Sequence, residues 1–587
     1  MRYDTAELDQ RRIMASLREK ATTTRTLRIA VLADFATQHL IPLLRGLFAR
    51  NQIEAEIYAG DYDTIETEIH DPGSDLYAFN PKFIVILCAS QKLTARFHAA
   101  TDAASFIARE TGRLAQLWAA VRSRCAATII QGNYITPSER GFGHYERMVE
   151  VSLGHAVANI NAQMIAEARA AGNVLLCDLD HIAGEIGRRN WFDERLWHIA
   201  KYPCRVEHMP LIAQAVVDVA LAVLGPFVKC VILDLDNTLW GGVIGDDGVE
   251  GITLGGYDEG EAFVAFQRFI LSLKQRGIIL AVVSKNEHAA AIQPFQSHPD
   301  MVLRESDIAV FIANWNNKAD NIRRVQKILN IGFDSMVFLD DNPFERGLVR
   351  EMLPEVIVPE LPEDPSLYLR AIADLNLFDT ASYSAADGKR NDQYREEAQR
   401  ALLRDAFTDI SDYLASLDMR LKAERFRPAN LARIVQLMQR SNQFNLTTSR
   451  FSEAACQAMM ADTAQFVPFT LTLSDKFGDY GLICVAVLKI APPAVEVVEF
   501  LMSCRVLKRG VEAFAMNEIV GVALRSGCTR VLGRYLRTAK NDMVRNFYAD
   551  FGFTCTAELD CGSSEWALDV SAWVPRQVFI TADINEI

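Results

Sequence analysis

The sequence predicts an α/β protein in which three domains follow one another along a chain of 587 residues. Short apolar segments alternate with amphipathic helical segments over residues 1–225, which is typical of a doubly wound parallel sheet. A second alternation of this kind begins near Phe227, and a meander of longer strands begins after Arg420. A chain of this length has room for roughly three or four domains.

The composition excludes several classes of protein. A formal charge of −14 and a pI near 5.3 argue against binding to the phosphate backbone of nucleic acids. The sequence has no apolar run of roughly 18 residues or more, so we expect no membrane span. Its first residues, MRYDTAELDQRRIM, are too charged for a signal peptide. The 11 cysteines form no C-x-x-C pair, which favours a reducing, cytoplasmic location.

Residues 1–225 are expected to form a parallel sheet resembling that of flavodoxin and of the SGNH esterases. The predicted strands are Leu27–Asp34, Ile53–Tyr58, Lys82–Ala89, Ala127–Gln131 and Asn173–Asp178. His181, Asp193 and His198 follow the last strand, where a hydrolase could place its Asp/His pair. No Gly-Asp-Ser nucleophile motif follows the first strand, and Asp34 stands there instead. We therefore expect a degenerate, non-catalytic esterase-like domain, with an active hydrolase as the alternative.

Residues 226–375 are expected to carry the chemistry. Val231–Leu233 is a short apolar strand, and Asp234 and Asp236 follow it directly. In parallel sheets the carboxyl ends of the strands form the ligand crevice. Two carboxylates held there repel each other, and a divalent cation neutralises them. The alternative is a strand followed by a helix that Asp236 or Asn237 caps.

Three further strand ends carry polar residues. Ser284 follows the strand Gly277–Val283, and a hydroxyl at a helix start can hold phosphate oxygens. Lys318 lies in the first turn of the next predicted helix, where an ammonium group can neutralise a transferring phosphoryl group. Asp340 and Asp341 follow the strand that starts at Met336 and form a second carboxylate pair. The residues beside these motifs are expected to bind substrate, namely Asn237, Thr238, Trp240, Lys285, Asn286 and Asn342.

A glycine-rich stretch from Val243 to Gly256, VIGDDGVEGITLGG, predicts a turn-rich hairpin beside the first aspartate pair. A flap of this kind could close over a substrate and exclude water from the reaction.

The order Asp-x-Asp, Ser, Lys, Asp-Asp resembles the haloacid dehalogenase (HAD) superfamily of phosphatases. The stretches LDLDNTLWGGVIGDDG and FLDDNPFER are similar to the FkbH-like branch, HAD subfamily IIIC. The resemblance continues in ADFATQHLIPLLRG and DPGSDLYAFNP near the N-terminus. It implies an enzyme that removes phosphate from 1,3-bisphosphoglycerate and loads the glyceryl group onto an acyl carrier protein, in polyketide or related biosynthesis.

The resemblance also implies a role for each motif. Asp234 is then the nucleophile that accepts the phosphoryl group, and Asp236 is the general acid and base. Ser284 and Lys318 hold the phosphate. The implied Mg²⁺ site consists of Asp234, the backbone carbonyl of Asp236, and Asp340 with Asp341. The residue types agree, since Mg²⁺ prefers carboxylates, phosphate oxygens and water.

One position departs from the family. Some members place a cysteine between the two motif aspartates to carry the acyl group, and this chain has Leu235 there. Cys230 lies too far up the predicted strand to replace it. Two other functions therefore stay open: a phosphatase acting on a small or carrier-bound phosphorylated metabolite, and a non-enzymatic scaffold for carrier-protein docking.

Residues 376–419 are expected to form a helical linker, and residues 420–587 a unit resembling the GNAT acyltransferases. The stretch FLMSCRVLKRGVE carries Arg505, Lys508, Arg509 and Gly510 at a strand–helix turn, similar to the loop that binds a pyrophosphate in that fold. These residues, with Arg534, Arg537 and Lys540, are expected to bind the pantetheine arm or the acidic surface of a carrier protein. A carrier-binding scaffold, a working acetyltransferase and a solvated basic face are the readings left open.

Overall fold

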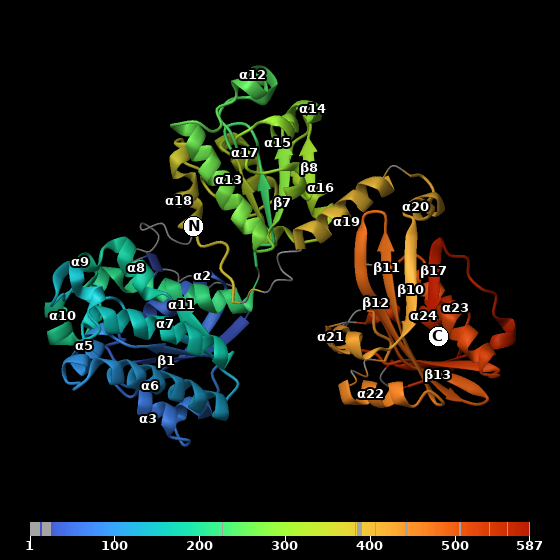
Figure 1. The fold of residues 1–587 in the computed structure, drawn as a ribbon, viewed down its shortest axis with the longest axis horizontal. Coiled ribbons are helices and arrows are strands. Elements are labelled where there is room, and N and C mark those ends of the chain that lie inside the picture. The colour runs from blue at the N-terminus through green and yellow to red at the C-terminus, as the bar shows by residue number, and fades with distance from the viewer. Residues whose placement is uncertain are drawn as a thin grey trace. The chain divides into compact units, whose positions relative to one another are not determined.

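The computed structural model describes residues 12–13, 25–225, 227–381, 383, 390–405, 407–440, 444–447, 449, 451, 453–503, 506–538, 541–559 and 562–585. The chain forms two compact units, Met1–Asn391 and Asp392–Ile587 (Figure 1). In the described part of the chain, the first unit holds two parallel sheets and the second holds one mixed sheet. The predicted α/β fold class is confirmed.

The N-terminal sheet has the strand order β2-β1-β3-β4-β5, and all neighbouring strands are parallel. Its strands are β1 (Arg25–Ala33), β2 (Ile53–Ala59), β3 (Phe83–Leu87), β4 (Thr128–Gly132) and β5 (Val174–Cys177). The helices are α2 (Leu40–Arg50), α3 (Ile65–His70), α4 (Asp75–Phe79), α5 (Ser90–His98), α6 (Ala103–Arg124), α7 (Leu153–Ala171), α8 (Leu179–Ile186), α9 (Arg188–Trp191), α10 (Glu194–Ala200) and α11 (Met209–Leu224).

Alternate residues of the central strands point to opposite faces of this sheet, as the two-residue period of a strand requires. Ile29 and Val31 of β1 pack with α2 and α11 on one face. Ala30 and Leu32 pack with α6 and α7 on the other. Both faces of the sheet are therefore covered by helices, which explains why the central strands read as continuous apolar runs.

One described segment, Val206–Leu224, is long and apolar enough to cross a membrane by length and composition. It contains α11, and 67% of its most apolar window is buried within the protein. Because α11 packs against the N-terminal sheet, its apolar surface belongs to the core of this domain.

The second parallel sheet has the order β8-β7-β6-β9. Its strands are β6 (Cys230–Leu233), β7 (Ile279–Ser284), β8 (Val310–Ala313) and β9 (Met336–Leu339). The helices are α12 (Ile244–Gly251), α13 (Glu259–Gln275), α14 (His288–Ala291), α15 (Gln293–Ser297), α16 (Lys318–Leu329), α17 (Pro343–Met352) and α18 (Tyr368–Ala373). Because β6 lies between β7 and β9, the residues that follow these three strands meet at one edge of the sheet.

The predicted hairpin over Val243–Gly256 is wrong, because the centre of this segment is helical. Only its base pairs in antiparallel fashion, where Gly241 bridges Thr253. The helix α12 lies between, interrupted at Gly248, where φ is +67°. The carboxylate of Asp247, inside the helix, accepts the backbone N–H of Val243, the residue before the helix, over 2.8 Å. This local bond offers the backbone an alternative to a strand ladder.

The C-terminal unit has one sheet of eight strands in the order β15-β16-β14-β13-β12-β11-β10-β17. The strands are β10 (Met419–Arg425), β11 (Phe466–Asp475), β12 (Gly478–Ala491), β13 (Ala494–Met502), β14 (Arg530–Tyr535), β15 (Thr554–Glu558), β16 (Ser564–Asp569) and β17 (Ile580–Asn585). The helices are α19 (Arg390–Asp405), α20 (Ile410–Ser416), α21 (Leu431–Arg440), α22 (Glu453–Ala461), α23 (Val511–Arg525) and α24 (Phe547–Asp550).

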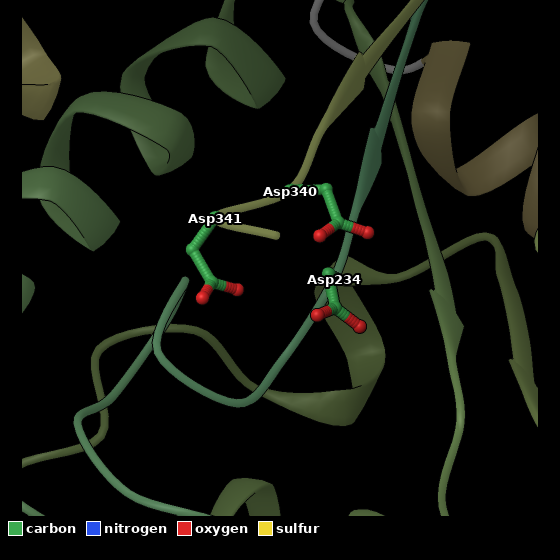
Figure 2. A group of neighbouring side chains, drawn as sticks. All are labelled: Asp234, Asp340 and Asp341. Atoms are coloured by element: carbon green, nitrogen blue, oxygen red, sulfur yellow. The ribbon is translucent and has the colours of Figure 1, made fainter. Parts of the chain in front are cut away.

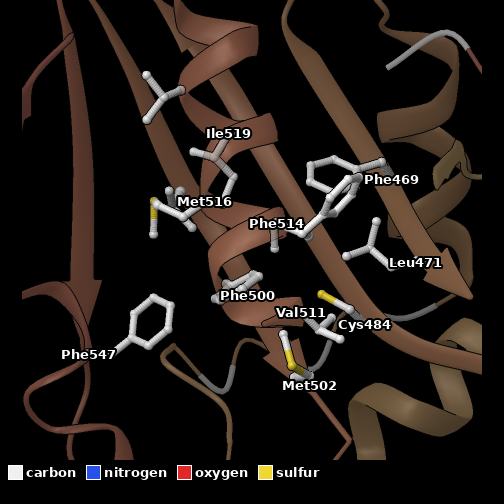
Figure 3. Close-up of a cluster of buried hydrophobic side chains, with 14 of the residues drawn as sticks. Phe469, Leu471, Cys484, Phe500, Met502, Val511, Phe514, Met516, Ile519 and Phe547 are labelled. Atoms are coloured by element: carbon white, nitrogen blue, oxygen red, sulfur yellow. The ribbon is translucent and has the colours of Figure 1, made fainter. Parts of the chain in front are cut away.

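This unit has the predicted GNAT-like arrangement, in which a meander leads to the parallel pair β13–β14 before the last strands cross back. The helix α23 connects the parallel strands β13 and β14 and packs on the sheet through Phe514, Met516 and Ile519 (Figure 3). The strand β17 was not predicted as a separate edge strand. It pairs in parallel with β10, more than 150 residues earlier, and no local pattern indicates such a partner.

Candidate active site

Three carboxylates meet at the carboxyl edge of the second parallel sheet. Asp234 leaves β6, while Asp340 and Asp341 leave the neighbouring strand β9 (Figure 2). One oxygen from each of these side chains lies within 4.8 Å of the other two. The backbone N–H of Asp234 donates to the carbonyl of Leu339 over 2.9 Å, which fixes the two strand ends relative to each other.

A single buried ammonium group faces this acidic trio, defined here as Asp234, Asp340 and Asp341. Lys318, the first residue of α16, places Nζ 2.5 Å from Oδ2 of Asp340 and 3.0 Å from Oδ1 of Asp234. Burial lowers the pKa of Lys318, and the two carboxylates reverse that effect, so its pKa is above the ordinary value. The lysine therefore stays protonated.

Three carboxylates against one ammonium leave an excess of negative charge in a buried place. Burial raises the pKa of Asp234 to about 6, and it also raises the pKa values of Asp340 and Asp341. A divalent cation would neutralise the remaining charge and keep all three groups ionised. The oxygen-only donor set and the excess charge of the trio fit a hard cation such as Mg²⁺.

The carboxylate of Asp236 points to a different set of partners. Its Oδ1 accepts the indole N–H of Trp240 over 3.1 Å and the backbone N–H of Ile244 over 3.0 Å. Its Oδ2 accepts the side-chain amide of Asn286 over 2.8 Å. The carboxylate of Asp236 is thus not part of the acidic trio, because both its oxygens are engaged elsewhere. A ligand role for its backbone carbonyl stays a prediction.

Trp240 and Asn286 were expected to bind substrate, which stays a prediction, and the structure places a side-chain N–H group of each on Asp236. The same amide nitrogen of Asn286 donates to Oγ of Ser284 over 3.2 Å. Ser284 is buried at the end of β7. Asn286 therefore connects the predicted phosphate-binding hydroxyl to the predicted acid and base.

The other expected substrate-binding side chains also have partners within the protein. Asn237 accepts the backbone N–H of Gly242 over 2.9 Å, and Thr238 exchanges hydrogen bonds with Asp341. Lys285 lies 2.6 Å from Glu345. These contacts hold the loops of the site in place, and substrate binding by the three side chains stays a prediction.

Asn342 follows the acidic trio directly and serves as the N-cap of α17. Its Oδ1 accepts the backbone N–H of Phe344 over 2.9 Å. Its side-chain oxygen thus stabilises the helix start, and substrate binding by Asn342 stays a prediction.

Two residues that support the site were not predicted from the sequence. Arg346 is buried and donates to the carbonyls of Asp340 over 2.8 Å and Asp341 over 2.6 Å. Tyr368 donates its hydroxyl to the carbonyl of Asn237 over 3.0 Å. The position of Arg346 shortly after the second aspartate pair could have indicated its role from the sequence. No local signal indicates Tyr368, which lies 131 residues from its partner.

The position between the motif aspartates offers no thiol. Leu235 and Cys230 are both fully buried. Burial raises the pKa of the Cys230 thiol far above its ordinary value, which makes it a poor nucleophile. Cys230 is also the only cysteine of the sequence between residues 227 and 381.

In the N-terminal domain, the residues considered for hydrolysis do not form a catalytic set. Asp34 accepts the backbone N–H of Ala89 over 2.6 Å, and burial raises its pKa to about 6. His181 lies 3.4 Å from Glu185, and Asp193 caps α10. His198 is exposed on α10. Among the described residues, no hydrogen bond joins two of these four side chains.

In the predicted anion-binding loop of the C-terminal unit, the structure describes only some of the expected basic side chains, and one of them points inward. Arg505 and Lys540 lie outside the described residues. Arg509 is buried, hydrogen-bonds to Tyr480 and lies 2.8 Å from Glu397, so it is not available to a carrier protein. Lys508 and Gly510 both have positive φ, of 61° and 86°.

Comparisons with known proteins give a family match and several similar structures. Residues 28–221 match the family model described as FkbH, N-terminal domain. The N-terminal part of BF1531 from Bacteroides fragilis, described as containing a phosphatase domain complexed with Mg, is 39% identical. That match covers 64% of this chain and 99% of the other, with a TM-score of 0.61. A search of curated proteins found no match.

Two further solved structures are similar to smaller parts of the chain. The ribosomal-protein-S18-alanine N-acetyltransferase from Escherichia coli is 12% identical, with a TM-score of 0.21 over 27% of this chain and 98% of the other. A GNAT-family protein from Desulfovibrio desulfuricans is 14% identical, with a TM-score of 0.21 over 26% of this chain and 99% of the other.

Proposed function

The chain belongs to the FkbH-like family, and on this premise we propose that it is a Mg²⁺-dependent HAD-type phosphatase whose nucleophile is Asp234. One observation carries the proposal: the acidic trio, of which Asp234 and Asp340 are buried, faces Lys318 at the carboxyl edge of a parallel sheet. Such a site suits a phosphate ester or acyl phosphate, whose negative oxygens need cationic partners.

Asp234, Asp340 and Asp341 would hold Mg²⁺, which supplies charge neutralisation for a transferring phosphoryl group. Lys318 adds a fixed positive charge beside Asp234 and keeps that carboxylate ionised for attack on phosphorus. The Asp234 carboxylate forms an O–P bond, and the bond between phosphorus and the leaving oxygen breaks. Asp236, held by Trp240 and Asn286, gives that oxygen a proton and then takes one from the attacking water.

The substrate we propose is 1,3-bisphosphoglycerate, and the acceptor is the phosphopantetheine thiol of an acyl carrier protein. The thiol displaces the acyl phosphate, while the ester phosphate is hydrolysed. The balanced reaction gives one glyceryl thioester and two phosphates from one 1,3-bisphosphoglycerate, one carrier thiol and one water. Family membership supports this choice.

Leu235 favours a second candidate function. With no thiol between the motif aspartates, the HAD domain has no side chain placed to carry the glyceryl group. A phosphatase acting on a small or carrier-bound phosphorylated metabolite needs no such group. Glyceryl transfer by this chain therefore requires direct attack of the carrier thiol on the acyl phosphate.

Incubation with Mg²⁺, 1,3-bisphosphoglycerate and candidate carrier proteins separates these functions by intact mass and phosphate analysis. A glyceryl adduct on the carrier with two phosphates released per adduct supports glyceryl transfer. Phosphate release above the spontaneous rate without an adduct supports the phosphatase. Neither product at any Mg²⁺ concentration contradicts glyceryl transfer from 1,3-bisphosphoglycerate and favours the docking scaffold.

A further inference from the structure

The parallel strands of the C-terminal unit separate soon after they begin to pair. The strands β13 and β14 pair only between Ala494–Glu496 and Arg530–Leu532. Beyond that point the facing edges diverge, and their backbone N–H and C=O groups need other partners. An extended chain with amide groups, such as the pantetheine arm of coenzyme A, could lie between such edges and hydrogen-bond to both.

The chain's own segment 444–447, which we call the plug, occupies this gap. The backbone N–H of Leu446 donates to the carbonyl of Phe500 on β13 over 3.0 Å. The N–H of Leu536, next to β14, donates to the carbonyl of Leu446 over 2.8 Å. Leu446 therefore bridges both separated strands, and Asn445 forms an antiparallel bridge with Leu501.

The plug is buried and is fixed by hydrogen bonds and aromatic contacts. Its residues are between 0% and 6% exposed. The side chain of Asn541, itself fully buried, donates to the carbonyl of Asn445 over 2.9 Å. Phe444 packs edge-on against Phe500 and Phe547, with ring centroids 5.9 Å and 5.4 Å apart, and Figure 3 shows the latter two within the core cluster. Removing the plug would expose an apolar core as well as backbone groups.

The space left between the point of separation and the plug is small. A cavity of about 240 Å³ is lined by residues of both strands and by Thr447 at the end of the plug. Sites for drug-sized ligands usually measure about 300–1,000 Å³. The cavity is therefore smaller than the usual site for a ligand of this kind.

The turn that would bind a diphosphate is also occupied from within. The carboxylate of Glu512, in the first turn of α23, accepts the backbone N–H of Lys508 over 2.7 Å. Arg509 points into the unit toward Glu397. A diphosphate at this turn would have to displace a carboxylate of its own charge, without help from the arginine.

We infer that the C-terminal unit is closed to coenzyme A and acyl-coenzyme A, with the plug in place of the pantetheine arm and Glu512 in place of the diphosphate. The unit is therefore an acyltransferase fold without a donor site. This closure does not depend on what the HAD domain transfers. It implies that any thioester chemistry of the chain uses a thiol that enters from outside this unit.

Isothermal titration of the full chain with coenzyme A and with acetyl-coenzyme A tests the closure. We expect no saturable heat with either ligand up to about 1 mM, which corresponds to a binding free energy weaker than about −4 kcal/mol. Saturable binding of either ligand below that concentration overturns the inference.

The variant Glu512→Ala tests the occupied turn by a gain of binding. Removing the carboxylate frees the N–H of Lys508, so inorganic pyrophosphate should bind at least about tenfold more tightly than to the wild type. The matched control is Glu518→Ala, which removes the same charge two turns along α23. Equal pyrophosphate affinity in Glu512→Ala and the wild type contradicts the role of Glu512, provided circular dichroism shows both folded.

The same variant tests the plug separately. Because the gap stays closed, coenzyme A should bind to Glu512→Ala no more tightly than pyrophosphate does. Coenzyme A binding tenfold or more tighter than pyrophosphate would mean that its pantetheine arm finds a place between β13 and β14, which overturns the inference.

Discussion

Trp240 donates its indole N–H to the carboxylate of Asp236, the residue four positions before it, over 3.1 Å. Trp240 is fully buried, so this hydrogen bond is shielded from water. The backbone N–H of Ile244, at the start of α12, donates to the same oxygen. The orientation of Asp236, the predicted general acid and base, is thus fixed by the loop that leads into α12.

The variant Trp240→Phe should lower kcat about 10- to 100-fold and leave KM within about twofold. The phenyl ring keeps most of the apolar contacts but removes the N–H, and a hydrogen bond to a charged group contributes about 1.5–3 kcal/mol. Steady-state phosphate release measures both constants.

Trp315→Phe is the matched control, because the exposed indole of Trp315 donates only to Glu287. It should change kcat less than about twofold. A Trp240→Phe enzyme with wild-type kcat would show that the orientation of Asp236 does not depend on Trp240.

The variant Lys318→Met should destabilise the metal-free protein by about 3–5 kcal/mol, because it leaves two buried carboxylates without their partner. Mg²⁺ should then raise the melting temperature more in this variant than in the wild type, since the cation meets more uncompensated charge. Thermal unfolding with EDTA and with Mg²⁺ measures both effects.

Lys327→Met, an exposed position on the same helix, serves as the control and should behave like the wild type. Equal Mg²⁺ effects on Lys318→Met and the wild type would argue that the acidic trio is not where the cation binds.

The raised pKa of Asp34 predicts that the stability of the N-terminal domain depends on pH. Its pKa is raised by burial from 3.8 to about 6, so the folded protein holds a proton that the unfolded chain releases. The stability from this proton is complete below pH 3.8 and is lost as the pH rises through 6, by at most about 3 kcal/mol. Asn at this position does not titrate.

Hydrogen exchange measures the free energy of opening of β1 and β3. Between pH 4 and pH 7 this free energy should fall in the wild type relative to Asp34→Asn. Asp61→Asn, at an exposed position, should show no such trend. A constant difference between Asp34→Asn and the wild type across this range would contradict the raised pKa.

The sequence was sufficient to place the acidic side chains at the strand ends. Parallel pairing of β6 with β7 and β9 follows from three apolar strands, and it brings Asp234 and Asp340 together without any knowledge of side-chain packing. Residue types and the order of motifs then predict a phosphate and metal site. The acidic trio with Lys318 agrees with that prediction in place and in partners.

Contacts over long separations could not be predicted in this way. Asn286 lies 50 residues from Asp236, and Arg509 lies 112 residues from Glu397. A polar residue beside a motif suggests substrate binding, and an arginine at a turn suggests anion binding. In this fold, each of these two side chains donates a hydrogen bond to a carboxylate far away in the sequence. The hairpin predicted where α12 lies was wrong for a local reason. The carboxylate of Asp247 accepts the backbone N–H of Val243 within a segment whose glycines suggested a hairpin.

Phosphoryl transfer to Asp234 is the central claim, and rapid-quench mass spectrometry with 1,3-bisphosphoglycerate and Mg²⁺ tests it most directly. The wild type should show the mass of one phosphoryl group on the peptide that contains Asp234, forming and decaying at rates compatible with turnover. Asp234→Asn should show none and release phosphate at least about 10³-fold more slowly. A phosphorylated peptide elsewhere in the chain, or normal turnover by the folded variant, would contradict the claim.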